Sequence, residues 1–320
     1  MRTVYLGTSD FAVTVLERLA ASDHRPQLVV TRPDRPRGRG RRLAPPPVAE
    51  GARALGIGVA QPENVNSPAA RELVAATRSD AVVVCAFGAL IAEPLLSAHE
   101  MLNVHPSLLP RWRGAAPIER AIEAGDEVTG VSIMRPIPEL DAGPVCLARA
   151  EAIRPDDDFG TLSQRLAELG GELLVEALDR RPEFVEQPEE GVTIAAKVDA
   201  ADRRLDPEHL GAVELERRVR ALTPHVGAWL EVRGDRLGVR RVRAMPGEGA
   251  ANPGAAQPGT LGAGADGRLL LACAPGILEL VEVQPAGGRP MPAADWLRGR
   301  GAELVGAAGS TAADPGRLGR

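Results

Sequence analysis

The chain has 320 residues, of which 44% are apolar and 25% are charged. This length and composition are typical of a globular protein with two domains, and no apolar run is long enough to predict a membrane-spanning helix. The formal net charge of −5 does not indicate a chain built mainly to bind nucleic acid. The N-terminus lacks the basic and then apolar layout of a signal peptide, so we expect a cytoplasmic protein without a membrane partner. The sequence leaves the oligomeric state open, with a monomer as the default expectation.

The use of cysteine and lysine narrows the chemistry further. Cys85, Cys146 and Cys273 are far apart and form no Cys-x-x-Cys or Cys–His pair, so we expect buried thiols and neither a metal site nor a disulfide framework. Lys197 is the single lysine among 38 basic residues. Arginine is the default basic residue of this chain, and arginine counts alone are therefore weak evidence of function.

The first residues predict a strand, a turn and a helix. Val4–Leu6 is apolar, Gly7–Asp10 has the composition of a turn, and apolar residues then recur at helical spacing over 11–19. Either Ser9 or Asp10 can cap that helix. The turn lies where a dinucleotide-binding fingerprint would lie, but it lacks the second and third glycines of that motif, so NAD binding is not expected.

The same alternation of strand and helix continues through the first half of the chain. Strands are predicted at 28–30, 81–86, 101–104 and 131–134, and helices at 48–55, 71–76, 118–123 and 162–178. Because these strands are uniformly apolar, they fit a parallel sheet that is buried on both faces. The sequence therefore predicts an α/β catalytic domain over residues 1–189, with a doubly wound, mostly parallel, Rossmann-like sheet.

A different pattern follows in the second half. Residues 190–207 are charged and contain proline, and we expect them to form a linker. After a predicted helix at 212–222, short strand-like segments separated by Gly and Pro turns occur at 228–232, 237–242, 269–273 and 278–283. This pattern predicts a smaller C-terminal β-barrel domain, similar to an OB fold, over residues 208–305. Residues 306–320 have the composition of a disordered tail.

Asn103 and His105 stand at the end of the strand predicted at 101–104. Their period-two spacing places both side chains on one face at the carboxyl end of the strand, where ligands bind in open parallel sheets. The amide can donate to a developing oxyanion, and the imidazole can exchange a proton near neutral pH. Asp141, in a Gly- and Pro-containing loop after another strand, offers a carboxylate to the same crevice, with Glu139 as the second choice.

These residue types suit one kind of chemistry. Asparagine, histidine and aspartate without a serine or cysteine nucleophile fit acyl transfer to an amine, because the amine itself attacks and the donors hold the oxyanion. A histidine and an aspartate 36 positions apart are nevertheless more often structural than catalytic. The residues by themselves predict a candidate amine-acylating site and leave the structural alternative open.

The stretch from Asn103 to Val145, NVHPSLLPRWRGAAPIERAIEAGDEVTGVSIMRPIPELDAGPV, resembles the active-site region of the enzymes that use 10-formyltetrahydrofolate as formyl donor. That family shares the Asn-x-His, the Ser-Leu-Leu-Pro that follows it, and a downstream Asp-x-Gly. The continuation Arg111–Ile118 is characteristic of the branch that acts on methionyl-tRNA. The resemblance runs through most of the chain in the same order, with further family-like segments at Gly7–Ala12, Arg32–Gly40 and Gln284–Gly287.

The resemblance implies a role for each matching residue. Asn103 and His105 polarise the formyl oxygen and stabilise the tetrahedral intermediate, while Asp141 orients His105 and assists proton transfer from the attacking α-amino group. Val84–Leu90 forms the other wall of the folate pocket. The resemblance also implies 10-formyltetrahydrofolate as co-substrate, no metal, and initiator methionyl-tRNA as acceptor. The residues that line the folate site are Ser107, Leu108, Leu109 and Pro110.

Residues 32–42 form an arginine-rich loop. Its composition alone favours a solvated surface loop. In the family this loop contacts tRNA, with arginines on phosphates and unpaired bases, so the resemblance favours a tRNA-binding role with Arg39 as the best single contact. The expected tRNA-binding residues are Arg35, Arg37, Arg39, Arg41 and Arg42. In the C-terminal domain a second basic face is expected from Arg217, Arg218, Arg220, Arg240, Arg241 and Arg243.

Two other functions stay open from the sequence. Relatives of the same family formylate a small amine, such as an amino sugar or a glycinamide ribonucleotide, but such an acceptor needs neither the arginine-rich loop nor the C-terminal domain. A folate-responsive RNA-binding protein without catalysis would keep its function when His105 is replaced. Methionyl-tRNA formylation is the function that the resemblance favours.

Overall fold

The computed structural model describes residues 1–299 except 38, 39, 41, 246–256 and 265, and it divides the chain into two compact units. The N-terminal unit consists of Met1–Ile118, Glu127–Pro155 and Thr161–Lys197. The C-terminal unit combines Glu119–Asp126 and Asp156–Gly160 with the chain from Val198 onward. None of the helices in the described ranges is long and apolar enough to cross a membrane.

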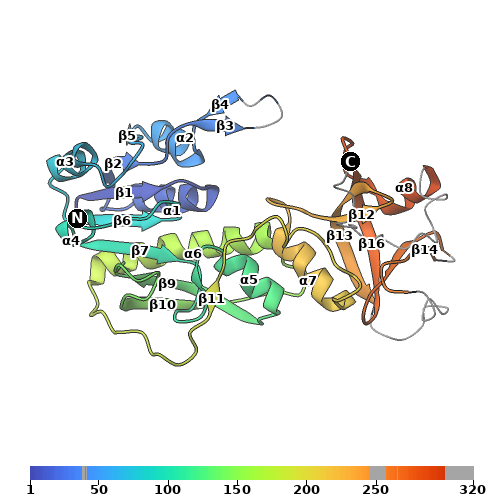
Figure 1. Ribbon diagram of the computed structural model, residues 1–320. Coiled ribbons are helices and arrows are strands. Elements are labelled where there is room, and N and C mark those ends of the chain that lie inside the picture. Colours follow the sequence, from blue (N-terminus) through green and yellow to red (C-terminus); the bar gives the residue numbers. More distant parts are fainter. Residues whose placement is uncertain (38–39, 41, 246–256, 265, 300–320) are drawn as a thin grey trace, which may run out of the picture. The chain divides into compact units, whose positions relative to one another are not determined.

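The N-terminal unit is built on one seven-stranded sheet (Figure 1). Its strands are β1 (Thr3–Gly7), β2 (Pro26–Val30), β5 (Gly58–Ala60), β6 (Ala81–Cys85), β7 (Met101–His105), β9 (Val128–Met134) and β10 (Val145–Ala152). Their order is β10-β9-β7-β6-β1-β2-β5, and the strands from β7 to β5 are parallel. Strand β9 is antiparallel to both β7 and β10. The prediction of a mostly parallel α/β sheet is confirmed.

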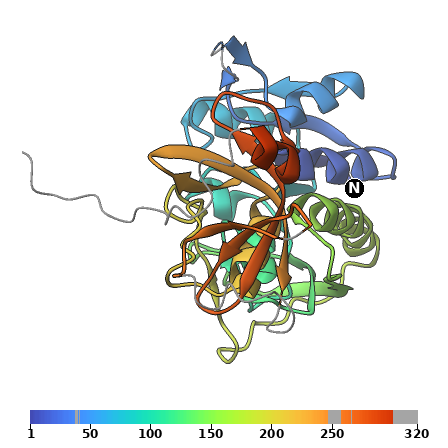
Figure 2. The same ribbon diagram turned by 90° about the vertical axis from the view of Figure 1, so that its right-hand side faces the viewer.

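Helices cover both faces of this sheet. The described helices of the unit, with α5 and the first two residues of α6 shared with the C-terminal unit, are α1 (Asp10–Ala20), α2 (Pro47–Ala54), α3 (Pro68–Ala76), α4 (Leu95–Ala98), α5 (Pro117–Ala124) and α6 (Phe159–Arg180). Helices α1 and α6 lie on the same face (Figure 2). A Cβ on Gly170 of α6 would lie 2.9 Å from Val104 of β7, and one on Gly171 would lie 2.7 Å from Arg18 of α1. These glycines therefore permit the close approach of α6. Val74 of α3 and Leu95 of α4 belong to the core of the other face.

Two short strand pairs complete the N-terminal unit. Strands β3 (Arg35–Arg37) and β4 (Arg42–Ala44) form an antiparallel pair within the arginine-rich loop. Strand β8 (Arg113–Gly114) pairs in parallel with β11 (Ile194–Ala195). The segment expected to be a linker therefore contributes a strand to the N-terminal unit, because its backbone hydrogen bonds go to residues far away in the sequence.

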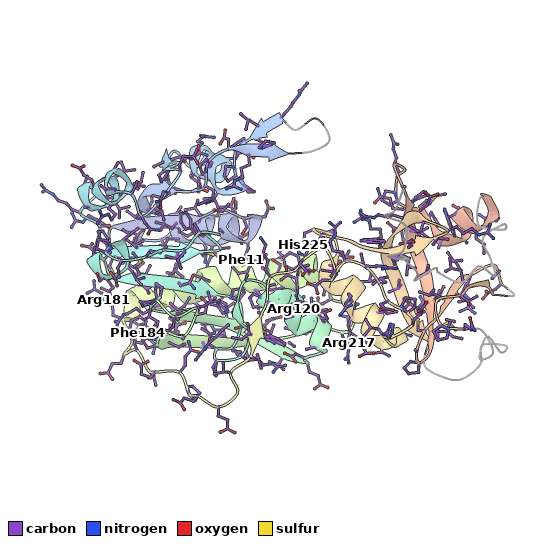
Figure 3. All side chains as sticks on the ribbon, viewed as in Figure 1. Phe11, Arg120, Arg181, Phe184, Arg217 and His225 are labelled. Carbon is purple, nitrogen blue, oxygen red and sulfur yellow. The ribbon has the colours of Figure 1, made fainter. Side chains whose placement is uncertain are left out.

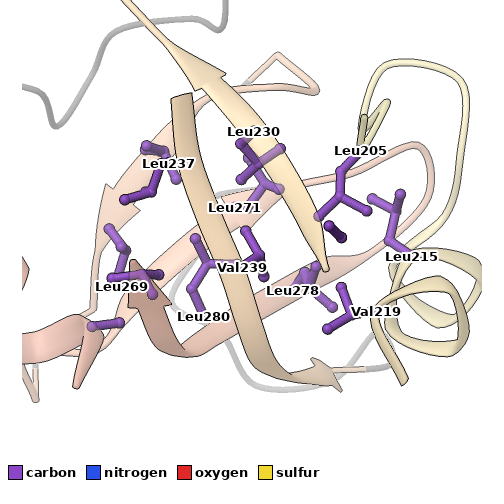
Figure 4. Close-up of a cluster of buried hydrophobic side chains, with 14 of the residues drawn as sticks. Leu205, Leu215, Val219, Leu230, Leu237, Val239, Leu269, Leu271, Leu278 and Leu280 are labelled. Carbon is purple, nitrogen blue, oxygen red and sulfur yellow. The ribbon is translucent and has the colours of Figure 1, made fainter. Parts of the chain in front are cut away.

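The C-terminal unit contains an antiparallel sheet with the order β12-β13-β16-β15-β14, and β17 pairs with β16. The strands are β12 (Ala228–Val232), β13 (Asp235–Met245), β14 (Leu261–Ala263), β15 (Leu269–Ala272), β16 (Ile277–Pro285) and β17 (Met291–Pro292), and the helices are α7 (Ala212–Leu222) and α8 (Ala293–Gly299). Leu215 and Val219 of α7 pack with Leu230 and Val239 of the sheet in one buried cluster (Figure 4). This sheet is consistent with the OB-like barrel that was expected.

Some local expectations were wrong or lie outside the described residues. Strand β10 was missed because its apolar run stops at Ala148 and its second half is mostly exposed. The first helix begins after Ser9, but the Ser9 side chain makes no cap hydrogen bond. The tail predicted at 306–320 lies outside the described residues.

Candidate active site

The carboxyl end of β7 brings the predicted catalytic residues together. Asn103 pairs with Val84 of β6 on one side and with Met134 of β9 on the other. His105 follows at the end of the strand, opposite Ser132 of β9. In open sheets with parallel strands, this edge is where the backbone leaves room for a ligand.

The imidazole of His105 is held by two groups. Its side chain is only 5% exposed, and Nε2 lies 2.9 Å from the carbonyl oxygen of Trp112. Because a carbonyl oxygen can only accept a hydrogen bond, Nε2 carries the hydrogen and Nδ1 is the nitrogen that can take up a proton. Nδ1 lies 3.7 Å from Oδ2 of Asp141, so the carboxylate faces the ring nitrogen that carries no hydrogen.

Asp141 occupies a strained position. Its φ of +48° lies in the left-handed region, which a residue other than glycine adopts only when its surroundings fix it there. Its Oδ2 accepts a hydrogen bond of 2.9 Å from the backbone N–H of Gly114. Gly114 has a φ of +127°, and a Cβ there would lie 2.6 Å from the carbonyl oxygen of Ala195. Glu139, the second choice, is exposed, so Asp141 is the carboxylate that reaches His105.

Asn103 has an amide that is available for a ligand. The residue is half-buried, and no hydrogen bond of its side chain is made with any described residue. An amide NH₂ on the same strand face as His105 can donate to an oxygen that becomes negatively charged. The site thus combines a free donor, an imidazole of defined tautomer and a fixed carboxylate.

Residues 107–110 form a turn that is fixed by its own hydrogen bonds. The hydroxyl of Ser107 is fully buried and donates to the carbonyl oxygen of Arg111 at 2.6 Å. The hydroxyl of Ser132 donates to the Ser107 carbonyl at 2.7 Å and accepts from the N–H of Leu109 at 3.2 Å. Leu108, Leu109 and Pro110 are half-buried. Ser107 therefore shapes the turn, whereas the side chains of the three residues after it stay partly exposed.

The predicted pocket wall over 84–90 is an irregular loop. Ala86 has a φ of +44° and Gly88 a φ of +71°. The hydroxyl of Thr8, from the Gly7–Ala12 motif, donates to the carbonyl oxygen of Phe87 at 2.7 Å. The N-terminal motif therefore supports this loop. This contact gives the polar turn after β1 a structural role, although the turn lacks a dinucleotide fingerprint.

The thiols of the N-terminal unit are unsuited to nucleophilic catalysis. Burial raises the pKa of Cys85, at the end of β6, to about 12. Burial also raises the pKa of Cys146, on β10, to about 11. Since the thiolate is the reactive form, neither cysteine competes as a nucleophile at neutral pH. Within the described ranges there is also no cluster of three or more His, Cys, Asp or Glu that could hold a metal ion.

The sequence patterns missed several residues that build the site. Thr193 accepts a hydrogen bond of 2.8 Å from the N–H of Trp112, and Gln187 contacts both Arg113 and the backbone of Asp141. Thr193 lies in the segment expected to be a linker, and Gln187 lies just before it. Ser132 was also missed, although a serine inside the apolar strand Val131–Met134 is a signal of a buried hydrogen bond.

The arginine-rich loop is anchored at its base. Gln61 donates to the carbonyl oxygen of Arg32 at 3.0 Å and to Asp34 Oδ1 at 2.7 Å. Arg35 and Arg42 are exposed, and neither side chain has a partner among the described residues. The predicted contacts Arg39 and Arg41 lie outside the described residues, and Arg37 is described only by the pairing of its backbone with Arg42.

Three of the six arginines expected to form a basic face on the C-terminal unit are paired with carboxylates. Arg218 bonds to Glu123 at 2.7 Å, Arg220 to Glu216 at 2.7 Å and Arg243 to Glu279 at 3.2 Å. Arg241 is exposed and has no partner within the part of the chain that the structure describes. The carboxylates therefore neutralise much of the positive charge that arginine counting suggested.

Comparison with known families gives two matches along the chain. The family described as "Formyl transferase" matches residues 1–178, and the family described as "Formyl transferase, C-terminal domain" matches residues 197–301. Among curated relatives, the methionyl-tRNA formyltransferase of Halorhodospira halophila is 44% identical over 93% of this chain and 96% of its own length. That of Ruegeria pomeroyi is 43% identical over 93% of this chain and 97% of its own length.

Solved structures show the same fold at much lower identity. HypX from Aquifex aeolicus in complex with tetrahydrofolic acid has a TM-score of 0.64 and 18% identity, covering 95% of this chain and 48% of HypX. The present chain thus spans about half the length of that protein. An N-formyltransferase from Helicobacter canadensis, in complex with folinic acid and dTDP-3-aminofucose, has a TM-score of 0.62 and 12% identity, covering 87% of this chain and 98% of that enzyme.

Proposed function

Because the chain belongs to the formyl transferase family and matches methionyl-tRNA formyltransferases over almost its whole length, we propose that it transfers the formyl group of 10-formyltetrahydrofolate to the α-amino group of methionine on initiator methionyl-tRNA. The observation that carries the chemistry is the free amide of Asn103 beside the His105–Asp141 pair at the end of β7. The product, formylmethionyl-tRNA, serves translation initiation, so we place the reaction in the cytoplasm, with the protein acting as a monomer.

The reaction exchanges one carbon–nitrogen bond for another. The amine nitrogen of methionine forms a bond to the formyl carbon, and the bond between that carbon and N10 of the folate breaks. The electron pair of the broken bond stays on N10, and one proton moves from the amine to N10. Formylmethionyl-tRNA and tetrahydrofolate leave, without an enzyme-bound acyl group.

The chain's own residues then have defined tasks. The Asn103 amide donates to the formyl oxygen as negative charge develops on it, which is the term that usually contributes most to acyl transfer. His105 Nδ1 handles the proton of the attacking amine, because Nε2 is bound to the Trp112 carbonyl. Asp141 stabilises the protonated imidazole from 3.7 Å. No step requires a metal ligand or a thiolate.

The donor and the acceptor contact different parts of the N-terminal unit in this proposal. Leu108, Leu109 and Pro110 contact the folate ring system, with 84–90 as the second wall and Ser107 acting through the turn that it holds. The exposed Arg35 and Arg42 contact tRNA phosphates, together with Arg37, Arg39 and Arg41 of the same loop. Residues on an anchored loop suit an acceptor much larger than the reacting amine.

An acceptor panel tests this function. The purified protein is incubated with 10-formyltetrahydrofolate and, separately, with charged initiator tRNA, free methionine, an amino-sugar nucleotide or glycinamide ribonucleotide. Formylated product with charged initiator tRNA alone is the expected result. Preferential formylation of either small amine would contradict the proposal, as would the absence of product with every acceptor.

A further inference from the structure

The segment 184–195, which we term the strap, connects α6 to β11. Figure 1 shows the chain leaving α6 and running past β9 and β10 before it reaches β11. All of its contacts described here lie within the N-terminal unit. The strap has no regular structure before β11, yet its hydrogen bonds converge on the loop that carries Asp141 and on residues 112–113, which lie beside His105.

The beginning of the strap is pinned to the base of the Asp141 loop. The ring of Phe184, labelled in Figure 3, lies 4.2 Å from the guanidinium of Arg135. Val185 and Val145 exchange two backbone hydrogen bonds of 2.9 Å each. Arg135 in turn donates its backbone N–H to the carbonyl of Pro144 at 2.9 Å. These contacts fix where the strap enters the site.

Gln187 connects the loop that carries Asp141 to the loop that contains Arg113. Its Nε2 donates to the carbonyl oxygen of Asp141 at 2.8 Å and to that of Gly143 at 2.7 Å. Its Oε1 accepts from Nε of Arg113 at 2.9 Å. The network allows only this orientation of the amide. If the amide were flipped, its oxygen would lie against two carbonyl oxygens and its NH₂ group would lie against the guanidinium, so no hydrogen bond could form at either end.

The end of the strap holds the other loop. Thr193 accepts from the N–H of Trp112 at 2.8 Å, and its carbonyl accepts from the N–H of Arg113 at 2.9 Å. Trp112 supplies the carbonyl that binds His105 Nε2, and Gly114 supplies the N–H that binds the Asp141 carboxylate. The same short loop therefore positions both partners of the catalytic pair.

Asp141 needs such support because of its backbone. A φ of +48° at a non-glycine residue persists only where neighbouring groups over-determine it. The carboxylate is fixed by Gly114, and the carbonyl of the same residue is fixed by Gln187. Gly143 also leaves no room to shift, since a Cβ there would lie 1.9 Å from the carbonyl oxygen of Arg135.

We propose that Gln187 is a positioning residue that holds Asp141 at its working distance from His105, by donating to the Asp141 and Gly143 carbonyls while accepting from Arg113. This inference rests on the proposed function, since it concerns the rate of that reaction. Gln187 contacts neither substrate, and it acts through the placement of the Asp141 carboxylate.

Gln187→Glu is the sharpest variant. It keeps the shape of the side chain and the oxygen that accepts from Arg113, but it removes both donor hydrogens and places negative charge against two carbonyl oxygens. Gln164→Glu, on the exposed surface of α6, adds the same charge away from the site and serves as the matched control. Gln187→Met removes the hydrogen bonds without adding charge.

The test compares steady-state formylation of methionyl-tRNA and thermal stability. We expect Gln187→Glu to lower kcat about 100-fold, as a displacement of about 1 Å does, with KM for both substrates within about threefold of wild type. Gln164→Glu keeps wild-type kinetics. In an Asp141→Asn background, adding Gln187→Glu should lower kcat by less than about a further threefold, because effects that act through one group are not additive.

Other results separate the failure of each claim. An unchanged kcat in Gln187→Glu, an effect confined to KM, or a loss that multiplies with that of Asp141→Asn overturns the role of Gln187 while wild-type formylation upholds the proposed function. If Gln187→Glu is poorly folded, Gln187→Met is judged by the same criteria. A well-folded wild type without formylation refutes the proposed function, and the positioning role falls with it.

Discussion

Two histidine–aspartate pairs, one from each unit, contain the same chemical groups but differ in the distance between them and in their exposure. In the N-terminal unit, His105 and Asp141 lie 3.7 Å apart with side chains that are 5% and 17% exposed. In the C-terminal unit, His209 and Asp206 lie closer, at 2.9 Å, but are 77% and 44% exposed. The closer pair also lines a cavity of about 470 Å³ in the C-terminal unit.

The difference shows what makes such a pair chemically useful. His209 and Asp206 are three residues apart in one turn, and water satisfies and screens both groups. His105 and Asp141 come from distant segments and are oriented by backbone groups of Trp112 and Gly114. Fixed orientation in a site that excludes water strengthens each electrostatic interaction. Neither cavity volume nor short distance identifies the site as well as converging backbone groups do.

The largest expected difference between the two pairs appears when each aspartate is replaced by asparagine. Asp141→Asn keeps an oxygen for the Gly114 N–H but removes the negative charge that stabilises the protonated His105. We expect kcat for formyl transfer to fall about 10³-fold, whereas Asp206→Asn leaves it unchanged. Steady-state kinetics with charged initiator tRNA measures both, and a similar loss in both variants would remove the distinction between the pairs.

One glycine in each unit tests how much room the surrounding atoms leave for a side chain. Gly143→Ala places a Cβ 1.9 Å from a backbone oxygen of Arg135, whereas a Cβ at Gly262 of β14 meets nothing within 4 Å. The loop of Asp141 must therefore shift, and we expect kcat to fall about 100-fold together with a lower Tm. Gly262→Ala should alter neither. Wild-type activity in Gly143→Ala would show that the loop tolerates displacement.

Much of the fold could be predicted because it depends on local patterns. Uniformly apolar strands such as Ala81–Cys85 identified the parallel sheet, and α7 was predicted at the residues that it occupies. The pair β8–β11 could not be predicted, because two residues on each side carry no periodicity and pair only through the tertiary fold.

The candidate site was predictable to a similar extent. Asn103 and His105 follow from strand periodicity, Asp141 was the first-choice carboxylate from its loop after a strand, and resemblance to a family gave all three their roles. Gln187 and Thr193 could not be found, because their function depends on hydrogen bonds to backbone groups about 46 and 81 positions away. Arginine counts misled for the C-terminal unit, since a sequence does not reveal that Arg243 is paired with Glu279.

Free and paired arginines offer a third test of the comparison. Arg35 and Arg42 in the N-terminal unit are exposed, whereas Arg243 in the C-terminal unit is paired with Glu279. We expect the double variant Arg35→Ala/Arg42→Ala to raise KM for tRNA about tenfold at low salt and to weaken its salt dependence. Arg243→Ala should change KM less than about twofold. Equal effects would assign tRNA binding to both units.

The smallest expected effect concerns acid stability. Burial alone would raise the pKa of Asp202 in the C-terminal unit, but hydrogen bonds from Arg120 and from the backbone of Asp199 lower it below its ordinary 3.8. In the N-terminal unit, a backbone hydrogen bond from Arg2 lowers the pKa of Asp80. A lowered folded-state pKa contributes stability above the unfolded value, and this stability is lost as pH falls below about 4.

Denaturant unfolding of Asp202→Asn and Asp80→Asn at pH 7 and at pH 3 measures this contribution. Each variant should be less stable than wild type at pH 7 and closer to it at pH 3, with kcat at neutral pH unchanged. A deficit that stays constant between the two pH values would show that the carboxylate charge is not what stabilises the fold.

We propose that His105, and not the more closely paired His209, carries the chemistry of formyl transfer. The most direct measurement is the single-turnover rate of formylmethionyl-tRNA formation by His105→Ala and His209→Ala, each with enzyme and folate in excess. We expect a loss of about 10³-fold or more in His105→Ala and the wild-type rate in His209→Ala. A wild-type rate in a folded His105→Ala would contradict the proposal.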